Sequence, residues 1–213
     1  MPMLCSAQSE WEAPTSANNT ENASVEKKAA GKESKIKEAS PSETKDWKYI
    51  QDNAVPEVEG KVVFSYDKEC PGKSAQQIYD LAYAALDSIA HSDNQISSSI
   101  ALINRKEHVI VSRNTEWLEF NKNFLSLDRT KFSYTIIARC ADNHISITLG
   151  RISYNYEEDR PTGFRTTAEK WITNKYAVNK KRTKLTAGAA KFRKKTIDRK
   201  DAIFEYIYKY INR

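Results

Sequence analysis

The sequence predicts a single α+β domain, with an antiparallel sheet of about five strands and helices packed on one face of the sheet. Three observations lead to this fold class. Several stretches of the chain alternate apolar and polar residues with the period of a half-buried strand, and turn residues separate them. One segment carries both a helix-capping signal and a helical apolar stripe. The last part of the chain has helical periodicity, which gives the element order β-α-β-β-β-β-α-α.

The first part of the chain is too polar to form a core. Residues 8–58 contain few large apolar side chains and are rich in Ser, Ala, Lys, Glu, Asn and Thr. Ordering the backbone costs about 1–2 kcal/mol per residue, and such a segment cannot bury enough apolar area to offset that cost. We therefore predict a disordered leader over 8–58 and a folded domain over 59–213. Within the domain, 59–160 would form the sheet and the first helix, and 161–213 the C-terminal helices.

The folded domain is predicted to begin with a strand and a helix. Val62, Phe64 and Tyr66 alternate with Val63, Ser65 and Asp67, and Cys70-Pro71-Gly72 then ends the strand. Ser74 and Gln77 have the spacing of a capping box, in which each side chain satisfies a backbone amide of the other. The apolar residues that follow repeat at helical spacing and predict a helix over about 74–91: Ile78, Leu81, Ala82, Ala85, Leu86 and Ile89.

Four more strands are predicted after this helix. The first spans Ile96–Asn104, and the second runs from His108 to Arg113 with an irregular continuation to Phe120. The third spans Lys131–Ala141, and Asp142-Asn143 joins it to the fourth as a tight hairpin turn. In the fourth strand, 144–156, the apolar phase slips by one residue at Gly150, which predicts a β-bulge there.

The remaining residues are predicted to be helical. Thr166 or Thr167 can cap a segment that continues to Tyr176, and a connector rich in Lys and Ala follows. Asp198 can then open a last helix. Its apolar stripe would be Ile203, Phe204, Ile207, Tyr208 and Ile211.

These elements resemble a known family. The strand Lys61–Tyr66 with its helix, the segment Trp117-Leu118-Glu119-Phe120, and the paired strands Phe132–Cys140 and His144–Tyr156 are similar to the domain of unknown function family 4468. The resemblance covers about 60–156 and implies a TBP-like fold, in which a curved antiparallel sheet carries helices. It also implies a secreted or envelope protein of a Gram-negative bacterium. No activity and no functional residues follow from it.

The net charge of +6 is concentrated near the C-terminus. Residues 170–213 hold 14 Lys and Arg against 3 acidic residues. Such a segment can attract nucleic acid, anionic lipid or an acidic partner, or it can form a solvated helical face. Nucleic-acid or other polyanion binding is therefore an alternative function, with Lys181, Arg182, Lys194 and Lys195 as phosphate contacts. It is disfavoured because an exported protein seldom meets DNA and no glycine-spaced aromatic signature of RNA recognition is present.

The preferred hypothesis is a non-catalytic binding or structural module. The natural ligand surface is the uncovered sheet face, lined by Ser133, Thr135, Ile137 and Arg139 opposite Ser146 and Thr148, although these side chains can equally form a plain solvent face. Trp117 and Phe120 can anchor a partner or can cover the core. The candidate partner-binding residues are Trp117, Phe120, Arg139, Lys181, Arg182, Lys194 and Lys195. The partner would be an unidentified protein or envelope ligand, and the sequence does not determine the oligomeric state.

The sequence predicts no catalytic, cofactor or metal site. Cys70 or Cys140 with His108 or His144 supplies the residue types of a nucleophile and its base, but nothing in the sequence brings them within reach of each other. No two histidines have metal-ligand spacing, and phosphate-binding glycine motifs are absent. An enzyme of unrecognised type is the remaining alternative. The two cysteines could pair in an oxidising compartment, and we prefer them as reduced thiols.

The first residues suggest export. Met1–Gln8 resembles the end of a secretory signal, with Cys5 and Ala7 as the small residues before a cut ahead of Gln8. We therefore expect residues 1–7 to be a signal remnant and the protein to reside in the periplasm or at the cell surface, with the cytoplasm as the alternative. Lipidation of Cys5 is a weaker reading of the same segment. No apolar run reaches the roughly 18–20 residues of a membrane helix.

Overall fold

The computed structural model describes residues 46–123 and 126–213 of the chain. The predicted signal remnant and the predicted leader up to residue 45 lie outside the described residues. Residues 46–58, which are also predicted to belong to the leader, are part of the folded domain, because they form α1 (Trp47–Ile50) and β1 (Glu57–Val58). Ile50 and Val55 are each only 3% exposed. The fold therefore begins before residue 59. Ile50 and Val55 are buried by contacts with distant parts of the chain, and composition alone does not reveal such contacts.

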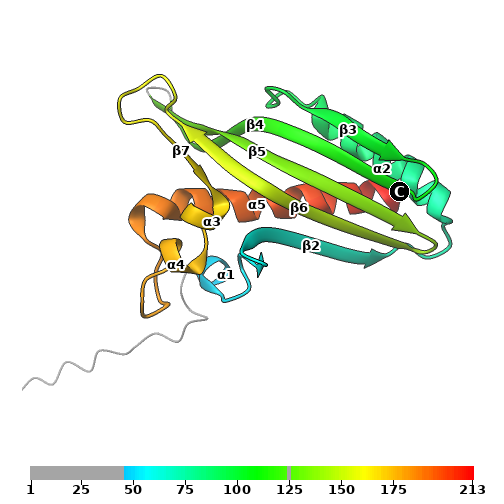
Figure 1. The fold of residues 1–213 in the computed structure, drawn as a ribbon, viewed down its shortest axis with the longest axis horizontal. Helices are drawn as coiled ribbons and strands as arrows, with labels where there is room; N and C mark the ends of the chain where they lie inside the picture. The colour runs from blue at the N-terminus through cyan, green and yellow to red at the C-terminus, as the bar shows by residue number, and fades with distance from the viewer. Residues whose placement is uncertain (1–45, 124–125) are drawn as a thin grey trace, which may run out of the picture. The chain divides into compact units, whose positions relative to one another are not determined.

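Seven strands form one antiparallel sheet in the described residues, two more than predicted. From one edge to the other they are β1, β2 (Lys61–Glu69), β6 (His144–Tyr156), β5 (Ser126–Ala141), β4 (Val109–Asn123) and β3 (Ser99–Asn104). The seventh, β7 (Phe164–Thr167), pairs with β6 beyond the end of β2. The fold class is confirmed: the chain forms a curved, open antiparallel sheet with helices (Figure 1).

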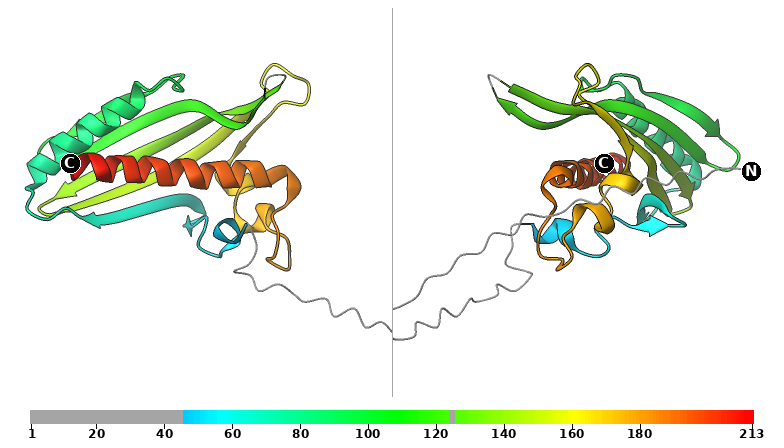
Figure 2. Two further views of the ribbon diagram at one scale, coloured as in Figure 1. Left: turned by 180° about the vertical axis from the view of Figure 1, so that it is seen from behind. Right: turned by 60° about the vertical axis from the view of Figure 1, so that its left-hand side comes forward.

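Two long helices cover one face of this sheet. Figure 2 shows α2 (Ala75–Ala90) and α5 (Ala187–Ile211) side by side on the same face. The predicted capping box begins α2, since the Gln77 amide donates to Ser74 Oγ and the Ser74 amide donates to Gln77 Oε1. The core lies between the helices and the sheet, where Ile78, Leu86, Ile136, Ile147, Leu149 and Ile207 are fully buried. No helix of the described residues has the length and apolar character that crossing a membrane requires.

The C-terminal third differs from the prediction. The helix expected from Thr166 to Tyr176 is divided into β7, α3 (Ala168–Trp171) and α4 (Asn174–Ala177). The last helix begins at Ala187 and not at Asp198, so most of the expected connector is helical. Ala189, Phe192, Thr196 and Ile197 are buried and continue the apolar face of α5 towards its start. The Lys and Arg residues between these positions make the segment look polar, so its apolar periodicity is not apparent from the sequence.

The hairpin of β5 and β6 carries the predicted turn and the predicted bulge. Asn143 takes a φ of 58° in the Asp142-Asn143 turn, a left-handed conformation that Asn tolerates better than most residues. The register between the strands shifts between Ser133 and Thr135, opposite residues 150–153. The left-handed residue of this bulge is Arg151, with a φ of 53°, while Gly150 pairs with both Val63 and Thr135.

Candidate functional site

The sheet face opposite α2 and α5, which we call the open face, follows directly from strand alternation. On β5, Phe132, Tyr134, Ile136 and Ala138 point towards the helices and are buried. The intervening residues Ser133, Thr135 and Ile137 are partly exposed on the other side. β6 repeats the pattern, with Ile145, Ile147 and Leu149 buried and Ser146 and Thr148 on the open face. The expected division between a core face and a polar face is therefore present.

The open face is hollowed at the point where the edge of β6 changes its partner. β2 pairs with β6 as far as Gly150, and β7 pairs with β6 from Ser153 onwards. A depression of about 600 Å³ lies between them. This open-face depression is lined by Lys61, Val63, Thr135, Ile137, Thr148, Gly150, Arg151, Ile152, Ser153, Thr167 and Glu169. Three of the residues expected on a ligand surface, Thr135, Ile137 and Thr148, thus lie in it together.

Gly150 keeps the β2 side of the depression closed. A Cβ at this position would lie 3.3 Å from the Val62 carbonyl oxygen and 3.6 Å from a methyl group of Val63. The first distance is tighter than an ordinary van der Waals contact, and a backbone carbonyl cannot swing away. A glycine here lets β2 approach β6 closely, so that Val63 and Ile137 supply apolar surface beside the hydroxyl groups of Thr135 and Thr148.

Charged side chains stand at the rim of the depression. Glu169 in α3 accepts a hydrogen bond from the Val62 amide at 3.1 Å. Burial alone would raise the pKa of Glu169, but hydrogen bonds from Thr167 and from backbone amides outweigh it and hold this pKa below its ordinary value. Glu169 is therefore an anion at neutral pH. Lys61 and Arg151 contribute two positive charges to the same rim.

The two aromatic candidates, Trp117 and Phe120, do not act together. Trp117 is on the open-face side of β4, where the Arg129 guanidinium lies 3.7 Å from its ring centroid and Lys131 Nζ lies 6.0 Å away. The Phe120 ring lies 4.5 Å from that of Phe192 in α5 and packs against the core. Phe120 therefore covers the core, which is the alternative considered for it. The Trp117 ring is already in contact with the Arg129 guanidinium of the same chain.

The five basic candidates are dispersed over the fold. Arg139 is exposed on β5 near the hairpin turn, whereas Lys181 and Arg182 are exposed between α4 and α5. Arg182 forms an ion pair with Asp52, and Lys194 forms one with Asp46. Lys195 is exposed on α5. The candidates do not converge on a single surface in the way that a phosphate-binding site requires.

The basic cluster at the start of α5 is largely used inside the fold. Lys191 Nζ lies 2.8 Å from an Asp128 carboxylate oxygen and also donates to the Tyr156 hydroxyl. Arg193 is fully buried and donates to the carbonyl oxygens of Tyr49 and Ile172, each at 2.6 Å, and to Asn174 Oδ1 at 2.7 Å. Burial lowers the pKa of Arg193 to about 10, which still leaves it charged at neutral pH. Few cations of this cluster remain for a polyanion.

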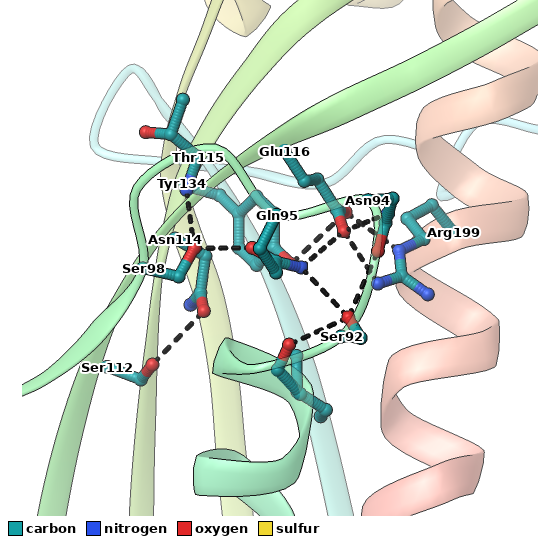
Figure 3. A network of polar contacts seen from close by, with 11 residues as sticks. Ser92, Asn94, Gln95, Ser98, Ser112, Asn114, Thr115, Glu116, Tyr134 and Arg199 are labelled. Carbon is teal, nitrogen blue, oxygen red and sulfur yellow. Dashed lines mark hydrogen bonds and ion pairs between the residues drawn. The ribbon is translucent and has the colours of Figure 1, made fainter.

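A second buried charge, Glu116 on β4, was not anticipated from the sequence (Figure 3). Its carboxylate is fully buried and meets Arg199 Nε at 2.7 Å and Arg199 Nη2 at 2.6 Å. Asn94 and Gln95 each donate at 2.7 Å, and the Tyr134 hydroxyl donates at 3.2 Å. The same alternation that buries Ile110 and Leu118 also buries Ser112, Asn114 and Glu116. The phase of β4 is the signal that could have revealed this network.

No hydrogen bond joins a cysteine thiol to a histidine ring in the described residues, although the Cys140 amide donates to the His108 carbonyl oxygen. Cys70 and Cys140 are buried free thiols. Burial raises the pKa of both, to about 12 for Cys140. His108 faces Gln76, and His144 lies 3.8 Å from Asp67. No cluster of three or more His, Cys, Asp or Glu residues suited to a metal ion occurs in the part of the chain that the structure describes.

Comparison with known proteins places this geometry in context. Residues 64–155 match a family model described as a domain of unknown function (DUF4468) with TBP-like fold. A DUF4468 family protein from Bacteroides ovatus has a crystal structure that is similar with a TM-score of 0.74 and 37% sequence identity, over 80% of this chain and 96% of that one. A TBP-like protein from Parabacteroides distasonis is 22% identical, with a TM-score of 0.61 over 74% and 96% of the two chains. A search of curated proteins gave no match.

Proposed function

The chain belongs to the DUF4468 family, and on that premise we propose that it is a non-catalytic binding module whose ligand site is the open-face depression. The observation that carries this proposal is the hollow itself. It lies on the sheet face that α2 and α5 leave uncovered, and its lining combines apolar side chains with hydroxyl groups and charges. Concave, largely apolar surface with a few directed polar groups is typical of sites that bind small molecules.

The lining also suggests a class of ligand. Val63 and Ile137 offer contact to an apolar body, and Thr135 and Thr148 can donate or accept hydrogen bonds at its edge. Lys61 and Arg151 favour a negatively charged group, while the Glu169 carboxylate disfavours one on its own side. The site therefore fits a small amphipathic molecule with one anionic group.

Other observations lead us to leave catalysis out of the proposal. The raised pKa values of Cys70 and Cys140 leave little thiolate at neutral pH, so neither is an activated nucleophile. The five donors around Glu116 occupy the oxygens that a general base would need. The two buried cysteines and the Glu116 network are parts of the folded interior, and none of their residues lines the open-face depression.

The proposal is tested with an amphipathic anionic dye, anilinonaphthalene sulfonate, whose fluorescence rises in apolar surroundings. The folded protein should bind the dye saturably, and Ile137→Asp should weaken binding by at least about tenfold, because it places a negative charge in the apolar part of the site. Tyr176→Asp is the matched control, since Tyr176 is an exposed apolar residue on α4 outside the depression. Equal binding by Ile137→Asp and the native chain would refute the assignment of the site.

We also propose that the protein works in the periplasm or at the cell surface. The signal-like segment Met1–Gln8 supports this location. Fractionation of cells that produce the protein from its own gene should find it outside the cytosol. Recovery with the cytosolic fraction would contradict the proposal.

A further inference from the structure

The edge of the sheet formed by β3 is unusually apolar and exposed. Leu102 is 60% exposed, Ile103 is 43% exposed, and Ile96 just before the strand is 40% exposed. These are three of the eight large apolar residues that stand out as exposed in the described part of the chain, and all three fall within nine consecutive residues. β3 is also the last strand at its end of the sheet, so its outer backbone groups have no neighbouring strand in the described fold.

This edge lacks two of the features that normally prevent sheets from joining, namely charged residues and proline. Natural edge strands are protected by short length, by bulges, by charged residues, by proline, or by a covering segment. The segment Ile96–Asn104 contains neither a charged residue nor a proline. The opposite end of the sheet is different, since β1 has only two residues and the adjacent β2 carries Lys61, Asp67, Lys68 and Glu69. One edge is thus protected and the other is suited to pairing with a further strand.

We propose that β3 pairs with the β3 strand of a second copy of this chain, antiparallel and across a twofold axis, so that the two sheets become continuous. A twofold axis places the same segment on both sides of the interface, so the side chains of β3 must be compatible with a second copy of themselves. The segment meets this condition, since it brings no like charges together. With the two strands centred on each other, Arg105 and Lys106 of one copy face Ser98 and Ser97 of the partner and not their own equivalents.

The protected edge explains why a dimer is the expected assembly. In the described part of the chain the other outer strands are less suited to pairing, since β1 has two residues and β7 has four residues and carries Arg165. Pairing through β3 therefore uses the available edge, and the assembly closes at two copies. A chain with two such edges would form an open-ended fibre. β3 has six residues, and a bulge between Ile100 and Leu102 interrupts its register. Such a short strand buries less area than permanent dimers do, so we expect the dimer to form in a concentration-dependent way.

Analytical ultracentrifugation of the full chain, from low micromolar to near-millimolar concentration, tests this proposal. The native chain should shift from the mass of a monomer to the mass of a dimer. Leu102→Lys should remain a monomer throughout, because it adds a charge to the edge at an exposed position that does not support the core. Val58→Lys is the matched control: Val58 is 55% exposed on β1 at the opposite edge, and this variant should dimerise like the native chain.

Amide hydrogen exchange provides a second readout. The amides of β3 should become more protected as concentration rises, and the amides of β1 should not. Unchanged far-ultraviolet circular dichroism and thermal unfolding would establish that both variants are folded. A native chain that stays monomeric, a Leu102→Lys chain that dimerises, or an assembly larger than a dimer would each overturn the proposal.

Discussion

Glu116 and Arg199 connect β4, the strand next to the β3 edge, to the last helix through two hydrogen bonds at 2.6 and 2.7 Å. Burial would lower the pKa of Arg199, but its bonds to Glu116 outweigh that effect and raise the pKa above its ordinary value. Arg199 is therefore charged at any physiological pH. A buried ion pair adds little stability over an apolar pair of the same size, but the loss of one partner leaves a desolvated charge.

Arg199→Met should accordingly destabilise the fold by about 3–5 kcal/mol, since the fully buried Glu116 carboxylate would lose its cation. The free energy of unfolding in urea measures this change. Lys209→Met is the matched control, because Lys209 forms an exposed ion pair with Glu205 on the same helix. Its loss should cost at most about 0.5 kcal/mol. Similar effects of the two substitutions would show that Glu116 is not dependent on Arg199.

At this scale the sequence predicted side-chain direction better than side-chain partners. Alternation correctly assigned Thr135, Ile137 and Thr148 to the open face, because a strand offers only two directions. It could not pair Arg193 with the carbonyl oxygens of Tyr49 and Ile172, since those contacts depend on how three short segments come together in space. Arginine in a run of basic residues looks solvated until its neighbours in the fold are known.

Among the elements, α5 differs most from what its sequence suggests. The residues from Asp198 onwards carry the predicted apolar stripe, and Ile203, Phe204, Ile207 and Ile211 are each at most 2% exposed. Before Asp198, Phe192, Arg193 and Ile197 are equally buried among exposed or paired lysines. Helical spacing identified only the C-terminal half of this pattern, because charged residues at neighbouring positions lower the average hydrophobicity of the N-terminal half.

Removing the chain from Asp198 onwards should abolish folding. Burial of the four apolar side chains is worth roughly 6–12 kcal/mol at about 1.5–3 kcal/mol each, which is comparable to the whole stability of a domain. By contrast, Lys194→Glu with Lys195→Glu should leave the protein folded, at a cost of about 1 kcal/mol for the Lys194–Asp46 ion pair. Circular dichroism and urea unfolding distinguish the two variants.

The same double variant separates the binding hypotheses. If the basic third bound nucleic acid, the native chain would bind duplex or single strands with an affinity that falls steeply with salt, and the variant would lose that affinity. We expect no such binding, because Lys191, Arg193 and Lys194 already have partners within the fold. Salt-dependent binding that the variant loses would favour the polyanion hypothesis over the open-face depression.

For the molecule as a whole, the first residues of the folded domain contribute more to the stability of the fold than their composition indicates. Tyr49 donates to the Asp198 carboxylate at 3.0 Å and offers its carbonyl oxygen to Arg193, so α1 is bound to the middle of α5. Ile50 and Val55 add apolar contacts at the same place. A window of mostly polar residues can still contain a few side chains on which the fold depends.

A chain that begins at Asp46 should therefore be as stable as the full chain to within about 0.5 kcal/mol. A chain that begins at residue 59, the boundary predicted from composition, should lose roughly 3–6 kcal/mol from Ile50 and Val55 alone, at about 1.5–3 kcal/mol each. Thermal and urea unfolding of the two truncated chains measure the difference. Equal stability would mean that α1 contributes nothing to the fold.

The predicted architecture was correct where local signals were strong. The capping box, the Asp142-Asn143 turn and the bulge near Gly150 each involve residues close together in sequence, and each is present. The two additional strands, β1 and β7, are two and four residues long, too short to show a period. They exist because β2 and β6 offer them open edges, which is a property of the assembled sheet.

The position of the two buried arginines also determines when the protein can fold. Arg193 and Arg199 lie near the end of the chain, and their acceptors Tyr49 and Glu116 precede them by 144 and 83 residues. While the ribosome is still making α5, Glu116 has no cation, and closing the core over its carboxylate would cost several kcal/mol. We therefore expect the sheet to become stable only after α5 has been synthesised. Until α5 has been made, we expect the nascent chain to lack a closed hydrophobic core.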